Sequence, residues 1–424
     1  MRGMKDSGIE WIGEVPNDWR IVRNKNAFVC NKELVGEKSE LTQLLSLTTR
    51  GIKKKDINNA EGKLPESFDT YQFVKENDIV MCLFDLDCSA VFSGISPFDG
   101  MISPAYRVLS CKESMEPRYA DYWFRYISDG RKFNHYAKNI RYTLSYEEFS
   151  ALPLLLPEKS EQRSIADYLD RKCSQIDAII AWQQEVIEKL KAYKLSVITE
   201  EVTKGLNPDV PMKDSGVEWI GEIPEHWVLN KLKYLSLDIG DGIHATPTYD
   251  EDGNVYFVNG NNIGEEYLVF KEDTNTISDT EYASYKLPLL TGNTVFVTLN
   301  GATYGKISFY HGEKILLGKS AGFITLKSTE SREFIRYYLQ SYTAKLIMDL
   351  SLLGSTIANL SLRTLRDFVI PYPPIEEQIQ IVNHLNNRTS SIDAAVSKKE
   401  KIVDELIDYK KSLIYEVVTG KKEV

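Results

Sequence analysis

Glycine-rich segments are the first places where this sequence could hold a reactive cofactor. Leu237–Gly242 reads LDIGDG, similar to a loop that binds S-adenosylmethionine, but such a loop opens a helix, and Pro247 opposes one soon afterwards. Gly318–Ser320 reads GKS and ends like a phosphate-binding loop, yet the glycine required five residues earlier is replaced by Glu313. Neither segment therefore predicts a cofactor or nucleotide site.

The spacing of histidine and cysteine offers no other catalytic chemistry. The chain has five of each, without the close spacing that holds a zinc ion. Gly301–Lys306 has the wrong spacing for a phosphate loop, and Asn207–Val210 lacks the aromatic residue of an amino-methyltransferase loop. We therefore expect a non-catalytic chain with no metal and no cofactor. Its odd number of cysteines is typical of reduced structural thiols: Cys30, Cys82, Cys88, Cys111 and Cys173.

The strongest pattern in the sequence is a repeat at about half its length of 424 residues. Met4–Trp19 reads MKDSGIEWIGEVPNDW, and Met212–Trp227 reads MKDSGVEWIGEIPEHW. The matches are MKDSG, EWIGE, one proline and one tryptophan. A second matched pair, Leu144–Gln162 and Leu360–Gln378, closes the two halves. Such a long period excludes a solenoid and predicts two whole domains with similar edges and different contents.

Long helical patterns follow each closing segment, over about 160–204 and 376–419. Each carries an apolar heptad seam, and the polar exceptions in the seam fall at equivalent places in the two copies. This predicts that the two helices pair as a coiled coil, although each helix could instead cover its own domain. The first seam holds Leu169, Ile176, Leu190 and Val197 at position a, and the second holds Leu385, Ile392, Leu406 and Leu413.

Connectivity predicts that these helices run antiparallel. The linker 206–211 is short, so a parallel arrangement would force the following domain to bridge a coil of roughly 60 Å, at 1.5 Å per residue. In an antiparallel coil the residue numbers across the seam add to a constant, for which we predict 585. This register places Ile176 against Tyr409, and Tyr193 against Ile392.

The regions inside each repeat that follow the matched opening segments, about 20–155 and 228–371, read as mixed helix and strand. β-rich runs such as Asp78–Phe84 and Thr294–Leu299 alternate with turn residues, and helical stretches follow at Tyr119–Ser128 and Ser331–Leu350. We predict an α+β protein with two globular domains separated by the antiparallel coil. The expected boundaries are 1–155 for domain one, 156–206 for helix one, 207–371 for domain two and 372–424 for helix two.

Bulk composition narrows the class of protein. No apolar run approaches the roughly 18 residues that span a bilayer, and Asp6 and Glu10 stand where a secretory signal would be apolar, so we expect a cytoplasmic protein. The net charge of −10 argues against tight nucleic-acid binding by the chain alone, because Lys and Arg supply most non-specific affinity for phosphates. Any such role would need a basic partner.

The ordered duplication resembles the DNA-specificity (S) subunit of type I restriction–modification systems over its whole length. The resemblance rests on the two WIGExPxxW openings, the two closing segments, and the tails Tyr193–Glu200 and Tyr409–Glu416. Segments Gly100–Tyr106, Gly240–Pro247 and Gly301–Lys306 are similar to family segments too. It implies two target-recognition domains that each read one half of a bipartite, asymmetric double-stranded DNA site. It also implies a coil that fixes the spacer, methyltransferase (M) subunits that dock on the helices and flip the base, and restriction (R) subunits that join them.

Residues that could contact DNA follow from the chemistry of groove readout, in which polar side chains read base edges and basic ones contact phosphates. Lys53–Lys55, Arg141-Tyr142 and Thr303-Tyr304 are the strongest candidates. For these residues, the alternative without function is a solvated lysine loop or a polar turn. For the whole chain, the alternative is a duplicated scaffold that binds protein or glycan rather than DNA. The candidates are Arg50, Lys53, Lys54, Lys55, Lys138, Arg141 and Tyr142 in domain one, and His244, Thr246, Asn261, Asn262, Thr303, Tyr304, Lys319, Ser355 and Asn359 in domain two.

Overall fold

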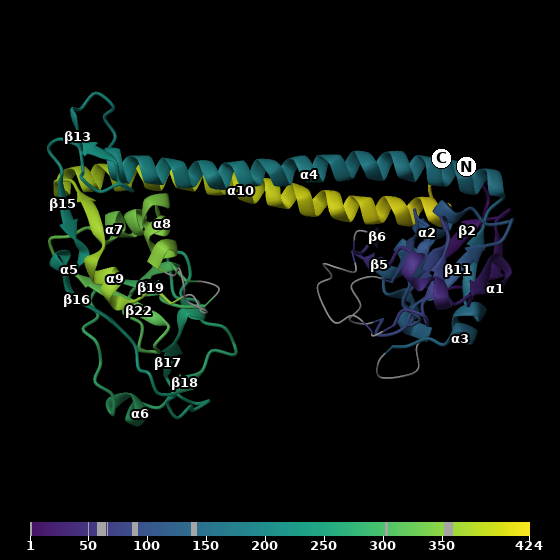
Figure 1. Cartoon of the computed structure of the whole chain (residues 1–424), viewed down its shortest axis with the longest axis horizontal. Helices are drawn as coiled ribbons and strands as arrows, with labels where there is room; N and C mark the ends of the chain where they lie inside the picture. Colours follow the sequence, from purple (N-terminus) through teal and green to yellow (C-terminus); the bar gives the residue numbers. More distant parts are fainter. Residues whose placement is uncertain are drawn as a thin grey trace. The chain divides into compact units, whose positions relative to one another are not determined.

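A computed structural model of the chain describes residues 2–49, 51–56, 65, 67–86, 92–136, 142–301, 304–351 and 359–424. The chain forms two compact units, Met1–Gln184 with Lys401–Val424 (unit 1) and Glu185–Glu400 (unit 2). Each unit combines antiparallel strands, short helices and a stretch of both long helices (Figure 1). The predicted α+β class with two paired long helices is confirmed.

Unit 1 contains twelve strands among its described residues, and one long helix, α4, leads out of it. Its elements are β1 (Met4–Asp6), β2 (Glu14–Pro16), β3 (Arg20–Arg23), α1 (Asn24–Ala27), β4 (Phe28–Asn31), η1 (Gly36–Leu41), β5 (Leu45–Thr48), β6 (Gly51–Lys54), β7 (Gln72–Val74), β8 (Ile79–Met81), β9 (Ser93–Ile95), β10 (Gly100–Ile102), β11 (Arg107–Cys111), α2 (Pro117–Asp129), η2 (Lys132–Tyr136), α3 (Tyr146–Ala151), β12 (Pro153–Leu156) and α4 (Lys159–Lys204).

Unit 2 begins and ends with the same kinds of elements but differs between them, and the second long helix, α10, follows its last strand. Its elements are β13 (Met212–Asp214), β14 (Glu222–Pro224), β15 (Val228–Lys231), α5 (Leu232–Leu235), β16 (Ser236–Asp241), β17 (Val255–Val258), η3 (Gly260–Asn262), β18 (Thr276–Ile277), α6 (Asp279–Ala283), β19 (Thr294–Thr298), β20 (Ile307–Phe309), β21 (Ile315–Leu317), β22 (Ala321–Leu326), α7 (Arg332–Gln340), α8 (Tyr342–Ser351), α9 (Leu362–Asp367), β23 (Val369–Tyr372) and α10 (Ile375–Val418).

A four-stranded antiparallel sheet of the same topology lies at the centre of each unit. Its strand order is β4-β11-β8-β9 in unit 1 and β16-β22-β19-β20 in unit 2. Every residue of β8 and of β19 is buried, as expected for strands covered on both faces. The units differ beside this sheet: unit 1 adds the β5–β6 hairpin and the β7–β10 pair, whereas unit 2 adds the three-stranded sheet β18-β17-β21.

The repeated opening segment forms a two-stranded hairpin in each unit, β1–β2 and β13–β14, with the same register. The tryptophan that ends the segment, Trp19 or Trp227, is completely buried in the main apolar core of its unit. Both cores also contain residues of α4 and α10, such as Leu169 and Leu385. The repeated segment therefore fixes the globular part of each unit to the long helices.

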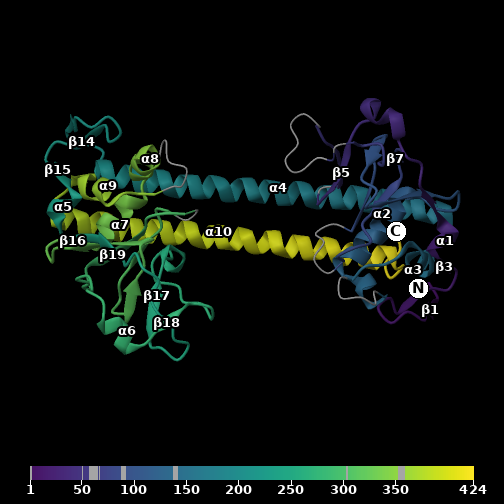
Figure 2. The same ribbon diagram turned by 60° about the horizontal axis from the view of Figure 1, so that its bottom comes forward.

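Helices α4 and α10 lie side by side and antiparallel within each unit (Figures 1 and 2). In unit 1 the Lys410 ammonium lies 2.7 Å from both carboxylate oxygens of Asp177. The residue numbers of the pairs in unit 2 add to between 581 and 591, and one pair meets the predicted sum of 585. These pairs are Lys191–Glu400, Lys194–Asp393, Tyr193–Arg388 and Glu201–His384.

The helical stretch predicted over Ser331–Leu350 is two helices, α7 and α8, rather than one. Ser341 ends α7 in an extended conformation, and its hydroxyl then accepts a hydrogen bond from the amide of Ala344 at 3.2 Å. The serine thus caps the next helix, which explains the break. Within the described ranges, no helix is both long and apolar enough to cross a membrane.

Candidate nucleic-acid interface

Polar residues of unit 2 gather around the carboxyl-terminal end of β19. The amide of Thr298 donates to the carbonyl of Lys306 at 2.9 Å, and the amide of Leu299 donates to the carbonyl of Ser320 at 2.9 Å. The Thr298 hydroxyl donates to the carbonyl of Gly260 at 3.2 Å. Three separate loops therefore meet at one strand end. We call this surface the β19 edge; it comprises 242–246, 259–262, 299–301, 304–306, 318–320 and 359.

Two predicted residues, His244 and Lys319, come from neighbouring chain segments at this edge. Ile243 pairs with Gly318 in an isolated bridge, and its amide donates to the carbonyl of Leu317 at 2.7 Å. The His244 and Lys319 side chains are exposed, as is Thr246, and His244 Nε2 lies 2.9 Å from Asp241 Oδ2. The bridge thus brings a basic residue and a hydrogen-bonding imidazole together.

The predicted asparagines have different environments. Asn262 is occupied in its own turn, since its Oδ1 accepts from the amide of Asn259 at 2.9 Å and its Nδ2 donates to the carbonyl of Val269 at 3.1 Å. Asn261 is exposed. Asn359 is exposed as well. It pairs in an isolated bridge with Asn300, the second residue after the end of β19. The structure therefore places Asn261 and Asn359 at the edge with their amides at the surface.

Tyr304 follows the same strand but is half-buried, and it packs against the main apolar core of unit 2. Its amide donates to the carbonyl of Gly301 at 3.3 Å in the turn between β19 and β20. Thr303 and Ser355 lie outside the described residues. Sequence reasoning missed Lys306, Asn300 and Ser320 at this edge; Lys306 ends the GATYGK segment, which was the available signal.

Two lysines of the run Lys53–Lys55 belong to β6 of the β5–β6 hairpin in unit 1, and Lys55 follows that strand. Lys53 pairs with Ser46, and Lys54 pairs with Leu45. Both lysine side chains are exposed, and the Lys54 ammonium lies 4.6 Å from the centre of the Phe98 ring. Lys55 is half-buried, and its amide donates to the carbonyl of Leu44 at 2.8 Å. A run that could have been a loop is therefore an ordered, basic strand.

Tyr142 lies at a different part of unit 1. Its φ angle is 44°, an uncommon value for a residue other than glycine, and its side chain is exposed. Its carbonyl accepts from the amide of Leu86 at 3.3 Å, beyond the end of β8. The remaining predicted residues of this domain lie outside the described residues: Arg50, Lys138 and Arg141.

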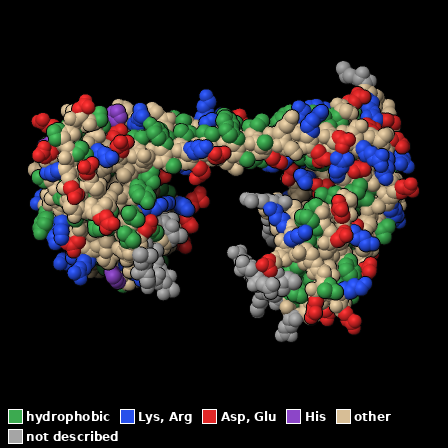
Figure 3. All heavy atoms as spheres, turned by 45° about the horizontal axis from the view of Figure 1, so that its top comes forward, with side chains coloured by type: hydrophobic (Ala, Val, Ile, Leu, Met, Phe, Trp, Pro, Cys, Tyr) green, Lys and Arg blue, Asp and Glu red, His purple; other side chains and the backbone are tan. Residues whose placement is uncertain are grey.

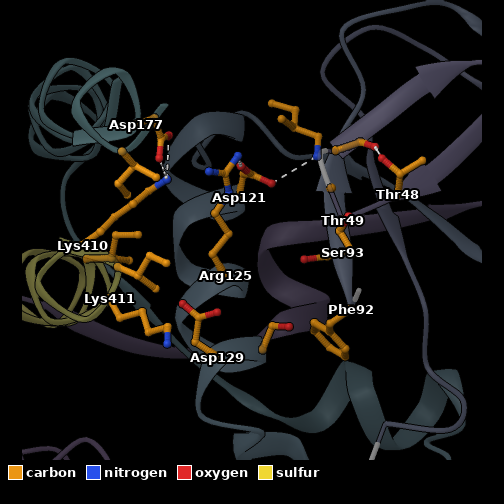
Figure 4. A pocket seen from close by; sticks show the side chains of 17 residues that line it. Thr48, Thr49, Phe92, Ser93, Asp121, Arg125, Asp129, Asp177, Lys410 and Lys411 are labelled. Carbon is orange, nitrogen blue, oxygen red and sulfur yellow. Dashed lines mark hydrogen bonds and ion pairs between the residues drawn. The ribbon is translucent and has the colours of Figure 1, made fainter. Parts of the chain in front are cut away.

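A hollow of about 630 Å³ lies in unit 1 between α2, the β5–β6 hairpin and the long helices (Figure 4). Asp121 is buried there, accepts from the amide of Ile95 at 3.1 Å, and pairs with Arg125 at 2.7 Å. Burial raises the pKa of Asp121 and of Asp129, which also lines the hollow. Lys410 and Asp177 form its wall on the long helices. Acidic and basic groups alternate in this hollow, so its net charge is small.

Three cysteines, Cys30, Cys111 and Cys173, are poor nucleophiles. Burial raises the pKa of the Cys111 thiol to about 12, and it also raises the pKa of Cys30 and Cys173. A thiol needs a lowered pKa to react at neutral pH. Among the residues that the structure describes, no group of three or more His, Cys, Asp or Glu side chains could hold a metal ion.

Comparison with known proteins finds similar sequences and a similar fold. Residues 240–403 match the family model described as "Type I restriction modification DNA specificity domain". The chain is 25% identical to the putative type I restriction enzyme MjaX specificity subunit of Methanocaldococcus jannaschii, over 97% of this chain and 96% of that protein. It is also 25% identical to the type I restriction enzyme MjaVIII specificity subunit of the same organism, over 97% of this chain and 94% of that protein.

A solved structure supports the fold over nearly the same extent. The chain superposes with a TM-score of 0.70, at 15% identity, on a chain from "Structural basis underlying complex assembly and conformational transition of the type I R-M system". The superposition covers 96% of this chain and 99% of that chain. At this identity the superposition supports the arrangement of helices and strands rather than any residue's role.

Proposed function

The chain belongs to the family of DNA-specificity subunits of type I restriction–modification systems, and we propose that it directs methyltransferase and restriction subunits to a bipartite, asymmetric DNA site. One observation carries this proposal: the likeness to specificity subunits spans both halves of the chain and almost the whole of each relative. A likeness limited to one half would support a single DNA-reading domain instead.

Each unit supplies one reader of the DNA in this proposal. The β19 edge of unit 2 carries exposed Asn261, Asn359 and Lys319, and amide side chains are suited to adenine while ammonium groups are suited to phosphates and guanine. In unit 1 the β5–β6 hairpin presents Lys53 and Lys54. The proposed division of the chain is 1–155 and 207–371 for the two readers, and 156–206 and 372–424 for the helices.

Methyl transfer and cleavage belong to the partner subunits in this proposal. The chain, in the cytoplasm, would determine which DNA site the complex binds. Because its net charge is −10, basic partners must provide much of the affinity for DNA. We expect the chain alone to bind a target duplex weakly. Nanomolar affinity at physiological salt without a partner would contradict this division of labour.

The long helices provide one docking face for a methyltransferase subunit in each unit. Tyr193 and Tyr409 stand 216 residues apart at equivalent positions of α4 and α10, and both side chains are about half exposed, at 45% and 54%. Hydrophobic side chains are visible on the surface of these helices (Figure 3). Large exposed aromatic residues are typical of interface hot spots. Tyr193→Ala and Tyr409→Ala should each weaken the binding of one M subunit, which native mass spectrometry would count.

The decisive test is co-expression with the cognate methyltransferase, followed by mapping of modified adenines. We expect methylation within a single motif that has two specified parts and an unspecified spacer. A stable complex without any methylation motif, or no complex at all, would favour a duplicated scaffold that binds protein or glycan.

A domain exchange tests the two-reader model separately. Replacing residues 228–371 with the corresponding region of another specificity subunit should change one half of the methylated motif and leave the other half unchanged. Methylation mapping of the chimera is the measurement. A change in both halves would mean that the two units do not read independently.

The coil acts as a ruler in this proposal, because continuous helices are stiff and α4 has 46 residues. Inserting one heptad into both α4 and α10 keeps the apolar seam in phase and lengthens the coil by about 10 Å, at 1.5 Å per residue. The unspecified spacer of the motif should then lengthen. Methylation at the original spacing would contradict the ruler.

A further inference from the structure

Each unit contains a hollow that is bounded on one side by a long helix, and the two hollows use equivalent helix positions. In unit 2, Lys191, Lys194, Leu195 and Ile198 of α4 line a hollow of about 270 Å³. The residues 216 positions later line the hollow of unit 1: Ile407, Lys410, Lys411 and Ile414. These positions on one long helix repeat, so the charges of the other lining residues can be compared; the larger hollow of unit 1 is also lined by Asp177 and Ile180 of α4.

The hollow of unit 2 is lined by more basic than acidic side chains. Lys191, Lys194 and Lys306 face a single lining carboxylate, that of Glu265. Lys194 is paired outside the lining with Asp393 at 2.7 Å. Lys191 has longer contacts, at 3.4 Å to Glu400 and 3.9 Å to Glu188, and about half of its side chain is exposed.

Such exposed contacts contribute little to stability, so a phosphate can compete with them. Lys191 and Lys306 are therefore the two ammonium groups of this hollow that are best placed to accept a new anionic partner.

An arginine adds positive charge beside this hollow. Arg336 of α7 lies one helical turn before Gln340, which lines the hollow. Its guanidinium stacks on Phe309 and Tyr337, at 5.0 and 4.7 Å from the ring centres, and its buried Nε has no hydrogen-bond partner among the residues that the structure describes.

The equivalent position in unit 1 carries the opposite charge. Tyr122 and Tyr337 are equivalent, since Tyr122 donates to Asp170 and Tyr337 donates to Asn386, 216 residues later. The residue before Tyr122 is Asp121, where unit 2 has Arg336. Besides Asp177, which is the equivalent of Asp393 in unit 2, two further carboxylates line the hollow of unit 1, those of Asp121 and Asp129, so it should attract phosphate less (Figure 4).

The basic hollow is continuous with the proposed reading surface. Lys306 belongs to both, since it lines the hollow and its carbonyl accepts from the amide of Thr298 at the end of β19. DNA carries one negative charge about every 1.7 Å of its axis, so a duplex held at the β19 edge brings several phosphates past adjoining surfaces.

We propose that the hollow of unit 2 binds the DNA backbone, with Lys191 of the long helix and Lys306 each contacting a phosphate, and that the hollow of unit 1 does not. The inference rests on the proposed function, because it requires a duplex at the β19 edge. It adds a direct contact between a long helix and DNA, so the coil positions the duplex as well as the readers.

The test measures the salt dependence of binding to a target duplex by the complex of this chain with its methyltransferase subunits. Each lost phosphate contact lowers the slope of log K against log salt by about 0.9. The Lys191→Gln/Lys306→Gln double variant should therefore lose about 1.8 of slope, and bind roughly 30-fold more weakly at 0.15 M salt. Lys191→Arg/Lys306→Arg should keep the slope, because the charge remains.

Matched controls separate charge loss from position. Lys410→Gln/Lys411→Gln removes two lysines from the hollow of unit 1, and Lys189→Gln removes an exposed lysine from another face of α4. Both should leave the slope unchanged, with subunit stoichiometry confirmed by native mass spectrometry. A double variant in unit 2 that binds its target specifically with the parental slope would overturn the inference. Failure of the parental complex to prefer any sequence would instead overturn the proposed function.

Discussion

Trp19 and Trp227 occupy equivalent positions in the two units and are both fully buried, but their indole groups have different polar environments. The Trp227 Nε1 donates to a carboxylate oxygen of Glu377 at 3.0 Å. The Trp19 Nε1 is buried with no hydrogen-bond partner among the described residues. Duplication has therefore kept the shape of this anchor while its hydrogen bonding has changed.

The carboxylates beside these tryptophans show the same divergence. Glu377 also contacts His226, at 2.9 Å, whereas the equivalent Glu161 pairs with Arg2. Arg2 reaches Asp18 as well, through its Nε at 3.0 Å, and Asp18 stands where unit 2 has His226. Close packing tolerates few shapes, whereas a polar partner can be exchanged when another nearby group satisfies the carboxylate.

Replacing the two tryptophans should have the largest effect and shows how far the anchors are equal. Trp19→Ala and Trp227→Ala should each lower the free energy of unfolding of their own unit by about 3–5 kcal/mol, because each leaves a large cavity in a core. Hydrogen exchange, read separately for peptides of each unit, is the measurement.

The corresponding phenylalanine variants test the difference in hydrogen bonding. Trp227→Phe should cost about 1 kcal/mol more than Trp19→Phe, because only the former removes a bond to a carboxylate. Equal costs would show that the polar difference between the anchors has no energetic consequence.

Two buried glutamines test the same comparison at the start of the long helices. Gln162 makes three hydrogen bonds, donating to the carbonyls of Ser114 and Pro157 and accepting from the amide of Glu116. Gln378 donates to one carbonyl, and its buried Oε1 has no partner among the described residues.

Leucine variants should therefore cost unequal amounts. We expect the free energy of unfolding to fall by about 3 kcal/mol for Gln162→Leu and by about 1 kcal/mol for Gln378→Leu. Each buried backbone group that loses its hydrogen-bond partner costs about 1 kcal/mol or more. Denaturation of each variant followed by hydrogen exchange gives the values. A larger cost for Gln378→Leu would contradict this accounting.

Sequence patterns predicted the duplicated arrangement and the two long helices well, because the repeated segments and the heptad spacing are strong signals that occur twice. Heptad spacing predicted both long helices. Connectivity alone required them to be antiparallel, and the contact between Lys410 and Asp177 agrees with that prediction. The break at Ser341 was missed, since a capping serine within an apolar helical pattern is indistinguishable from a surface serine until its φ and ψ angles are known.

The candidate interface was less predictable. Lys319 and His244 were proposed for their chemistry, but their proximity depends on the bridge between Ile243 and Gly318, which joins segments far apart in the chain. Asn262 illustrates the opposite outcome, because its amide is engaged within its own turn. The basic hollow was not predicted at all, since Lys191 reads as an ordinary exposed residue of a coil until Lys306 is placed beside it.

A pH-dependent difference between the units should arise at Glu201. The equivalent residue of unit 1 is Val417, which is fully buried, and the Glu201 Oε2 is buried with no hydrogen-bond partner in the described part of the chain. Burial raises the pKa of the Glu201 carboxyl, although His384 at 3.3 Å opposes this effect. The charged form of Glu201 therefore lowers the stability of unit 2 fully above its folded pKa. This cost decreases as the pH falls through the folded pKa, and it is absent below the unfolded pKa of about 4.3.

Glu201→Gln should stabilise unit 2 at pH 7, and the gain should shrink as the pH approaches 4. Unfolding curves between pH 4 and pH 8 would measure this, with Glu218→Gln, at an exposed position of unit 2, as the matched control. A gain that is independent of pH, or one that the control shares, would show that burial of the Glu201 carboxylate is not the cause.

The smallest expected effect concerns the ion pairs that both units retain. Lys410–Asp177 and Lys194–Asp393 have the same geometry, with each ammonium 2.7 Å from both carboxylate oxygens, and both carboxylates are 56% exposed. Double-mutant cycles with alanine should give a coupling of roughly 0.2–1 kcal/mol for each pair, and less at high salt. Equal couplings would mean that duplication preserved this contact in energy as well as in geometry. A clearly weaker coupling in unit 1 would show that its lining acids, which include Asp129, compete for Lys410, and would thereby strengthen the electrostatic contrast between the two hollows.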